Sequence, residues 1–271
     1  MRPRFGSSIL LGAVVLFALA PFLWAFLASF SSGAGQGASA SLWPMHLTLA
    51  HYRALFAERA FWLPIRNSLV VAGATTVLCV SVGTFAAYAL ARLEMRGKRA
   101  LLSAILAVTM FPQIAIVSPL YMLLRALRLI DTYPGLVLPY VTFAMPLTVW
   151  LLVGFLRQLP RDLEEQAMID GATRWQAMTR VILPLGAPGI ATTAILTFIY
   201  CWNEFLFALS FTLGPERQTV PVAIALFRGQ YQIPWGEILA GAIVATAPVA
   251  LVVLAFQRRI VQGLTAGAVK G

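Results

Sequence analysis

Six long apolar stretches constrain this chain more than any other feature of its sequence. A helix that crosses a membrane needs about 20 mostly apolar residues, and the segments that reach this length are residues 9–30, 67–91, 100–124, 133–156, 186–211 and 238–257. None of them contains a charged residue except the stretch 186–211, which contains Glu204. The sequence therefore predicts an all-α membrane protein with six transmembrane helices and a single transmembrane domain, residues 1–271.

The composition agrees with this class. The chain is 60% hydrophobic and only 11% charged, whereas soluble domains carry about 25% charged residues. Its length of 271 residues leaves no room for a large additional domain. The first stretch follows a basic N-terminus, as in a signal peptide, but its apolar run exceeds the usual core of about 7–15 residues. We therefore expect a retained helix.

The basic residues predict the orientation of the helices. Thirteen of the 20 lie in the termini and in the segments 92–99 and 157–180, and the other seven lie in the loops 31–66, 125–132 and 212–237. Cytoplasmic segments carry the excess of Lys and Arg, so we expect both termini to be cytoplasmic. This asymmetry accounts for the net charge of +10 without nucleic acid as a partner.

A polar segment, residues 160–185, separates the fourth and fifth stretches. Asp162, Glu164 and Glu165 follow Pro160, and acidic residues in a first turn complement the positive end of a helix. The segment therefore predicts a short helix on the cytoplasmic side.

A turn and a second helix follow in the same segment. Gly171 suits a left-handed position after the first helix, and Thr173 with Gln176 matches a capping box for the second. We expect the second helix to end near Pro184. Such a helix–turn–helix could rest on the lipid surface or insert into the groove of a soluble partner.

The same segment resembles the EAA motif of permease subunits in bacterial ABC importers, E-A-A-x3-G-x9-I-x-L-P. It reads Glu165-Gln166-Ala167, then three residues to Gly171, then nine to Val181-Ile182-Leu183-Pro184. The resemblance implies a coupling helix that binds the ATPase subunit. The positions that it assigns to this contact are Glu165, Ala167, Asp170, Gly171, Leu183 and Pro184.

Two further stretches are similar to MalG-type permeases of carbohydrate importers: "WNEFLFALS" (202–210) and the tail "QRRIVQGLTAGAVKG" (257–271). The resemblance implies import of a maltose-, trehalose- or other oligosaccharide-like sugar across the bacterial cytoplasmic membrane. It also implies a MalF-type second permease, a dimer of ATP-binding subunits that holds ATP and Mg, and an extracytoplasmic sugar-binding protein. Within the tail, residues 258–271, it implies a second ATPase contact at Gln262, Gly263, Leu264 and Thr265.

The sequence contains no motif of an enzyme. Neither lysine, Lys98 or Lys270, stands in a P-loop pattern, and His46 and His51 do not form a metal-binding HExxH motif. We expect no catalytic residue, metal or cofactor in this chain, so ATP hydrolysis belongs to a partner.

The candidate substrate pathway centres on Glu204, because ionisable residues within spans usually face a cavity or another helix. Its neighbours Trp202 and Asn203, and Gln113 in the third stretch, are candidates for binding hydroxyl-rich ligands. The rival functions are an ion-coupled secondary transporter and a membrane scaffold. The first usually needs internal repeats and further buried charges, which this sequence lacks.

Overall fold

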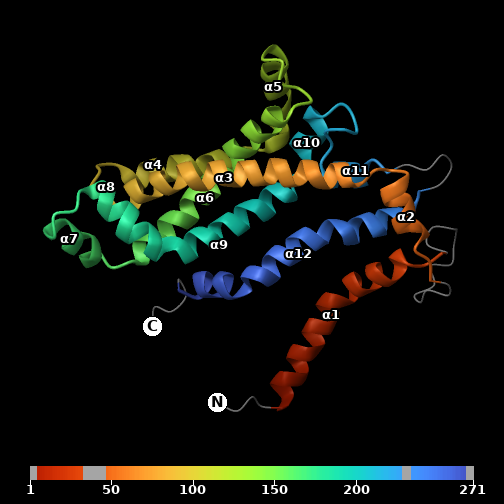
Figure 1. Cartoon of the computed structure of the whole chain (residues 1–271), viewed down its shortest axis with the longest axis horizontal. Coiled ribbons are helices and arrows are strands. Elements are labelled where there is room, and N and C mark those ends of the chain that lie inside the picture. The colour runs from red at the N-terminus through yellow and green to blue at the C-terminus, as the bar shows by residue number, and fades with distance from the viewer. Residues whose placement is uncertain (1–4, 33–46, 228–232, 267–271) are drawn as a thin grey trace. The chain divides into compact units, whose positions relative to one another are not determined.

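The computed structural model describes residues 5–32, 47–227 and 233–266, and the side chains of 10–257 within these ranges. Every regular element in these ranges is helical (Figure 1). The helices are α1 (Phe5–Ser29), α2 (Ala50–Ala57), α3 (Trp62–Arg92), α4 (Lys98–Ala107), α5 (Gln113–Ala126), α6 (Tyr133–Gln158), α7 (Asp162–Ile169), α8 (Arg174–Ala177), α9 (Leu183–Trp202), α10 (Leu206–Phe211), α11 (Val220–Ala225) and α12 (Trp235–Ala266). A 3₁₀ turn, η1 (Val108–Met110), follows α4, and a π-helical turn, η2 (Met178–Ile182), joins α8 to α9.

The chain divides into two compact units, and the first comprises residues 1–63 and 223–248. In this unit the end of α1 is joined to α2 by a hydrogen bond of 2.7 Å between the hydroxyl groups of Ser29 and Tyr52. Arg59 forms an ion pair with Glu237, and its guanidinium lies 4.6 Å from the ring centroid of Phe227. These contacts hold α2 to the beginning of α12.

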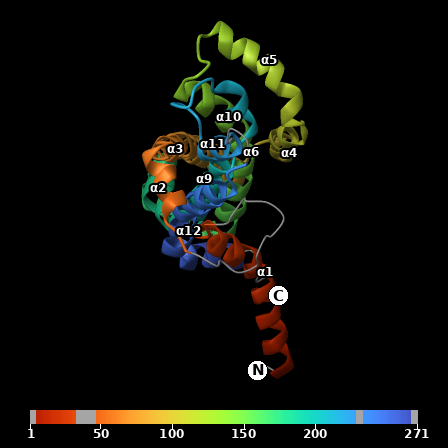
Figure 2. The ribbon, with the colours of Figure 1, turned by 90° about the vertical axis from the view of Figure 1, so that its right-hand side faces the viewer.

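The second unit comprises residues 64–222 and 249–271. Its core is formed by buried apolar side chains of α3, α6 and η2: Ala87, Tyr88, Leu90, Ala91, Val149, Leu152, Val153, Leu156, Met178 and Ile182. Helix α9 packs along α6, and a hydrogen bond of 2.9 Å between the hydroxyl groups of Thr148 and Thr197 joins them. Helix α5 extends away from this bundle in both ribbon views (Figures 1 and 2).

Within the described ranges, five helices are long and apolar enough to cross a membrane: Leu10–Ser29, Trp62–Arg92, Tyr133–Gln158, Arg174–Trp202 and Trp235–Gln257. A sixth candidate is broken, because Lys98–Met110 and Gln113–Ala126 meet at 89°. The break falls at Phe111, whose backbone is extended with φ −72° and ψ 130°. A residue that precedes proline disfavours the helical region, so Pro112 accounts for the end of the first segment. The all-α fold predicted from the sequence is confirmed.

Candidate functional site

Helix α7 is the first part of the candidate site, and it is fixed to the core by a buried carboxylate. Asp162, Glu164 and Glu165 lie in its first turn, as the sequence predicts. Glu164 is only 7% exposed and accepts a hydrogen bond from the hydroxyl of Tyr88 on α3. Because a buried polar group is costly to leave without a partner, this contact determines which face of α7 points inward. Glu165 points outward and is exposed.

The turn after α7 has the C-cap geometry that the sequence predicts. Gly171 has a φ of +92°. Its N–H donates to the carbonyl of Met168 at 3.1 Å, and the N–H of Ala172 donates to that of Ala167 at 2.9 Å. These two bonds form a Schellman motif, which requires the left-handed residue to be glycine or to accept strain.

The second helix begins with the predicted capping box. The backbone N–H of Gln176 donates to the hydroxyl of Thr173 at 3.3 Å, and the backbone N–H of Thr173 donates to the side-chain oxygen of Gln176 at 2.9 Å. This start of α8 is therefore confirmed.

The expectation that this second helix ends near Pro184 is wrong. Helix α8 continues through η2 into α9, and Pro184 is the second residue of α9. Proline lacks the N–H that a helix interior requires, and a local π-helical turn such as η2, in which the N–H of Leu183 donates to the carbonyl of Met178, accommodates it. The polar segment is thus continuous with the following apolar helix.

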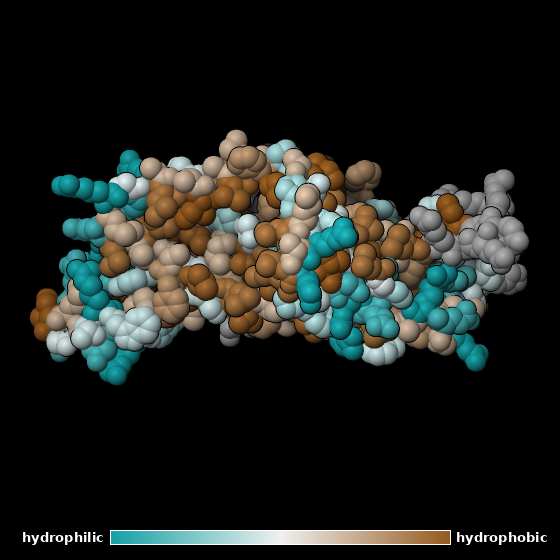
Figure 3. Space-filling model, turned by 90° about the horizontal axis from the view of Figure 1, so that it is seen from above, coloured by the Kyte–Doolittle hydropathy of each residue, from teal (hydrophilic) through white to brown (hydrophobic). Residues whose placement is uncertain are grey.

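The outer face of this helix–turn–helix is exposed. Glu165, Asp170, Gly171 and Pro184 are exposed, while Ala167 and Leu183 are half-buried. In Figure 3 one group of hydrophilic side chains lies at the end of the second unit that carries α7 and α8, and others lie elsewhere on the same face. None of the six candidate coupling positions is enclosed in the core.

Two large apolar side chains that the sequence reasoning missed lie on the same segment. Ile169 is 84% exposed and Trp175 is 62% exposed. The Trp175 ring stacks on Phe85 of α3, with the centroids 5.8 Å apart and the planes 12° apart. Exposed apolar groups rimmed by charge are typical of protein contacts. One indication of their role was present in the sequence: Ile169 and Trp175 lie within one helix turn of Gly171 and Thr173, residues of the predicted turn and capping box.

A hollow of about 460 Å³ lies against α7. Both Glu164 and Glu165 line it, together with Arg92, Arg161 and Arg174. The mixture of carboxylate and guanidinium groups offers complementary charge to a polypeptide partner.

The candidate pathway residues lie at the end of α9. The predicted stretch 186–211 is interrupted, because α9 ends at Trp202 and α10 begins at Leu206. The carboxylate of Glu204 accepts hydrogen bonds from the N–H groups of Phe207 at 2.8 Å and Ala208 at 3.1 Å. Glu204 therefore satisfies the first donors of α10, and this accounts for an ionisable residue at that position.

The other three pathway candidates have different surroundings. Trp202 is buried and contacts the ring of Phe198, whereas Asn203 is exposed and donates to the carbonyl of Ile199 at 2.8 Å. The side-chain amide of Gln113 donates to the hydroxyl of Tyr200 at 3.1 Å. The structure thus brings α5 and α9 together through Gln113 and does not gather all four candidates around one cavity.

The predicted tail contact cannot be described at the level of side chains. The backbone of Gln262, Gly263, Leu264 and Thr265 continues α12, which ends at Ala266. The side chains of residues 258–266 and all of residues 267–271 lie outside the described part of the chain.

Fold and site together define a polytopic transport permease, and comparison with known proteins gives the family. The family model described as "binding-protein-dependent transport system inner membrane component" matches residues 79–266. The chain belongs to this family. Its arrangement resembles a solved bacterial ABC transporter involved in the import of alginate, with a TM-score of 0.77, 24% identity and coverage of 93% of this chain and 94% of the other.

Relatives of known description are similar along nearly their whole length. The trehalose transport system permease protein SugB of Mycobacterium tuberculosis is 50% identical over 95% of this chain and 94% of its own. The trehalose/maltose transport system permease protein MalG of Thermococcus litoralis is 41% identical over 98% and 95%. The sulfoquinovosyl glycerol permease SmoH of Agrobacterium fabrum is 41% identical over 93% and 89%. The predicted resemblance to ABC importer permeases is confirmed.

Proposed function

We propose that this chain is one of the two permease halves of a heteromeric importer that moves a sugar across the bacterial cytoplasmic membrane. ATP hydrolysis would take place in separate subunits. The single observation that carries the proposal is the exposed helix–turn–helix of α7 and α8, which the core holds at one end and α9 continues at the other. A polar surface element connected so directly to apolar helices suits the transmission of force from a soluble partner.

In the proposed mechanism, α7 and α8 bind a cleft on a dimer of ATPase subunits, which hold ATP and Mg. Closure of that dimer would move Gly171 and its neighbours. The motion would reach α3 through the hydrogen bond between Tyr88 and Glu164, and it would reach α9 through η2. A MalF-type permease would complete the pathway, and a sugar-binding protein would deliver substrate to the face opposite α7.

The proposed substrate is a trehalose- or maltose-like glucoside. This choice is supported by the names of the two relatives with 50% and 41% identity, which refer to trehalose and to trehalose/maltose. Gln113 and Asn203 supply amide groups that can both donate and accept hydrogen bonds from sugar hydroxyls. We propose them as pathway residues, with Glu204 and Trp202 shaping the break between α9 and α10.

The test is uptake by the complete transporter in vesicles, supplied with binding protein, internal ATP and a panel of disaccharides. We expect sugar-stimulated ATP hydrolysis and uptake that persists after ionophores collapse the ion gradients. Uptake that stops with the gradient would indicate an ion-coupled transporter instead. The import function would be contradicted if no sugar of the panel stimulated ATP hydrolysis and no sugar was taken up.

A further inference from the structure

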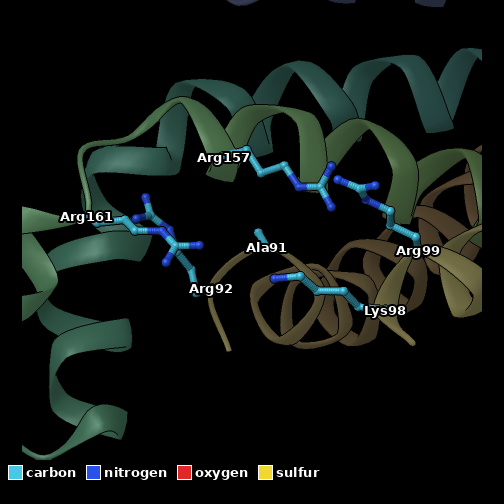
Figure 4. A pocket seen from close by; sticks show the side chains of 6 residues that line it. All are labelled: Ala91, Arg92, Lys98, Arg99, Arg157 and Arg161. Carbon is cyan, nitrogen blue, oxygen red and sulfur yellow. The ribbon is translucent and has the colours of Figure 1, made fainter. Parts of the chain in front are cut away.

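A second hollow lies close to the candidate coupling residues and includes none of them. Its volume is about 330 Å³, and its lining residues are Ala91, Arg92, Lys98, Arg99, Arg157 and Arg161. They come from the end of α3, the beginning of α4, the end of α6 and the turn before α7 (Figure 4). All six residues belong to the second compact unit. We call this site the basic hollow.

The basic hollow concentrates positive charge, and its acidic neighbours lie outside its lining: Glu164 and Glu165 line the adjacent hollow beside α7, which shares Arg92 and Arg161. Five of its six lining residues are cationic and none is acidic. Within the described ranges none of these five cations forms an ion pair, and the pair of Arg59 with Glu237 lies in the other unit. Figure 4 shows the guanidinium groups of Arg99 and Arg157 directed toward each other. Like charges in such an arrangement repel one another, so an anion would be stabilised between them.

The hydrogen-bonding capacity of the hollow is also only partly used. Arg92 is 7% exposed and donates to the carbonyl of Leu159 at 2.7 Å, but its Nε atom is buried without a partner. Within the described ranges, the guanidinium groups of Arg99 and Arg157 donate to no other residue. Guanidinium groups match the geometry of phosphate oxygens and bind them through paired hydrogen bonds.

The position of the basic hollow indicates the source of the anion. Helices α3 and α6 are apolar enough to span a membrane, and the hollow lies where both of them end. On the adjoining helix α4, Leu101 is 51% exposed, which offers apolar contact to an acyl chain. Basic pockets between membrane helices bind the headgroups of anionic lipids, and the volume falls within the range of about 300–1,000 Å³ for small-ligand sites.

We propose that the basic hollow binds the phosphate group of an anionic phospholipid headgroup. Inorganic phosphate shares this chemistry, and the experiment must separate the two. The inference is independent of which sugar is transported and of whether α7 binds an ATPase.

The test compares the complete transporter carrying Arg99→Gln and Arg157→Gln with the wild type. Each is reconstituted in nanodiscs of phosphatidylcholine with a fluorescent phosphatidylglycerol, and lipid binding is measured by energy transfer from the protein. Each guanidinium of the hollow would lose a charge-assisted hydrogen bond of about 1.5–3 kcal/mol, whereas a surface cation contributes about 1 kcal/mol through general attraction. We therefore expect lipid binding to weaken at least about 150-fold in the double variant, and by no more than about 30-fold when two surface charges are removed. The matched control is Arg96→Gln with Arg180→Gln, which removes two exposed charges that do not line the hollow.

Three results would overturn the proposal. The first is lipid binding by the double variant equal to that of the wild type. The second is an equal loss in the Arg96 and Arg180 control, which would indicate general surface attraction. The third is displacement of the lipid from the wild type by millimolar inorganic phosphate at constant ionic strength, which would assign the site to the free anion. Sugar uptake is measured in parallel, so that loss of transport is not mistaken for loss of lipid.

Discussion

At the scale of single residues, the candidate site depends on two side chains with opposite surroundings. Glu164 is buried against Tyr88, while Glu165 beside it is exposed. The sequence predicts an acidic first turn, but it cannot tell which carboxylate faces the core. That assignment depends on Tyr88, which lies 76 positions away along the chain.

Gly171→Asp is expected to leave membrane insertion intact and to abolish sugar uptake. A side chain at this left-handed position is strained by about 1–2 kcal/mol, and the added carboxylate would project into open space on the proposed ATPase contact, since nothing lies within 4 Å of a Cβ there. Membrane fractionation and uptake assays measure the two effects.

Gly97→Asp is the control, because Gly97 also has positive φ and open space around a Cβ but lies outside α7 and α8. Normal sugar uptake by the Gly171 variant would contradict the proposal that α7 and α8 bind the ATPase subunits. A similar loss of uptake in both variants would assign the effect to strain alone.

Tyr88→Phe and Glu164→Leu should each lower the stability of the chain by about 1–3 kcal/mol, because each leaves a buried polar group without its partner. The double variant should cost less than the sum of the two single changes. Thermal unfolding of the solubilised complex measures the stability of the wild type, the two single variants and the double variant. The ratio of sugar transported to ATP hydrolysed measures how tightly transport is coupled to hydrolysis. Additive shifts in melting temperature would mean that the two groups do not interact.

At the scale of elements, local chemistry accounts for what could be predicted. The capping box at Thr173 and the left-handed Gly171 depend on residues a few positions apart, so their sequence patterns are sufficient. The bend at Pro112 could not be predicted in the same way. Pro139 and Pro146 lie inside an unbroken α6, which shows that packing against neighbours decides whether a proline breaks a membrane helix.

The continuity of α8 with α9 was missed for a related reason. Proline usually ends a helix, but Pro184 follows the π-helical turn η2, which accommodates it within a continuous helix. The π-helical turn that precedes it has no simple sequence pattern. The six apolar stretches could be found from hydropathy, whereas their breaks and joints depend on tertiary contacts.

Thr173→Ala should loosen the start of α8 without affecting the membrane helices. Loss of an N-cap costs about 1 kcal/mol, which corresponds to about a fivefold larger open fraction and equally faster cleavage by trypsin at Arg174 and Arg180. Limited proteolysis of the purified complex measures the rate. Thr173→Ser keeps the hydroxyl and should restore slow cleavage, and equally fast cleavage of the Ser variant would show that the cap is irrelevant.

At the scale of the whole molecule, the chain leaves much apolar surface uncovered. On α1, Phe17 is 84% exposed and Leu10 is 67% exposed, and the 18-residue apolar window found within α1 has no buried residue. Such a surface is stable in contact with lipid or with other apolar side chains rather than with water. Polar contacts between residues far apart in the sequence, such as Arg59 with Glu237 and Tyr88 with Glu164, therefore help to stabilise each unit.

Glu237→Gln is expected to lower the melting temperature of the complex slightly, by the equivalent of about 0.5–1 kcal/mol. The ion pair with Arg59 is about three-quarters buried, since the side chains are 29% and 22% exposed, but partly exposed pairs contribute little in water. The matched control is Glu58→Gln, an exposed neighbour of Arg59. Equal shifts in the two variants would show that the pair has no specific effect.

The unbroken backbone from α8 through η2 to α9 has a mechanical consequence. Its 29 residues from Arg174 to Trp202 form a rod about 43 Å long at the rise of an α-helix. A helix resists extension far more than it resists tilting, so displacement at one tip must appear at the other as a swing or a twist. Trp175 lies at one end of this rod, and the break at Glu204 between α9 and α10 lies at the other. A displacement of Trp175 would therefore move the break at Glu204.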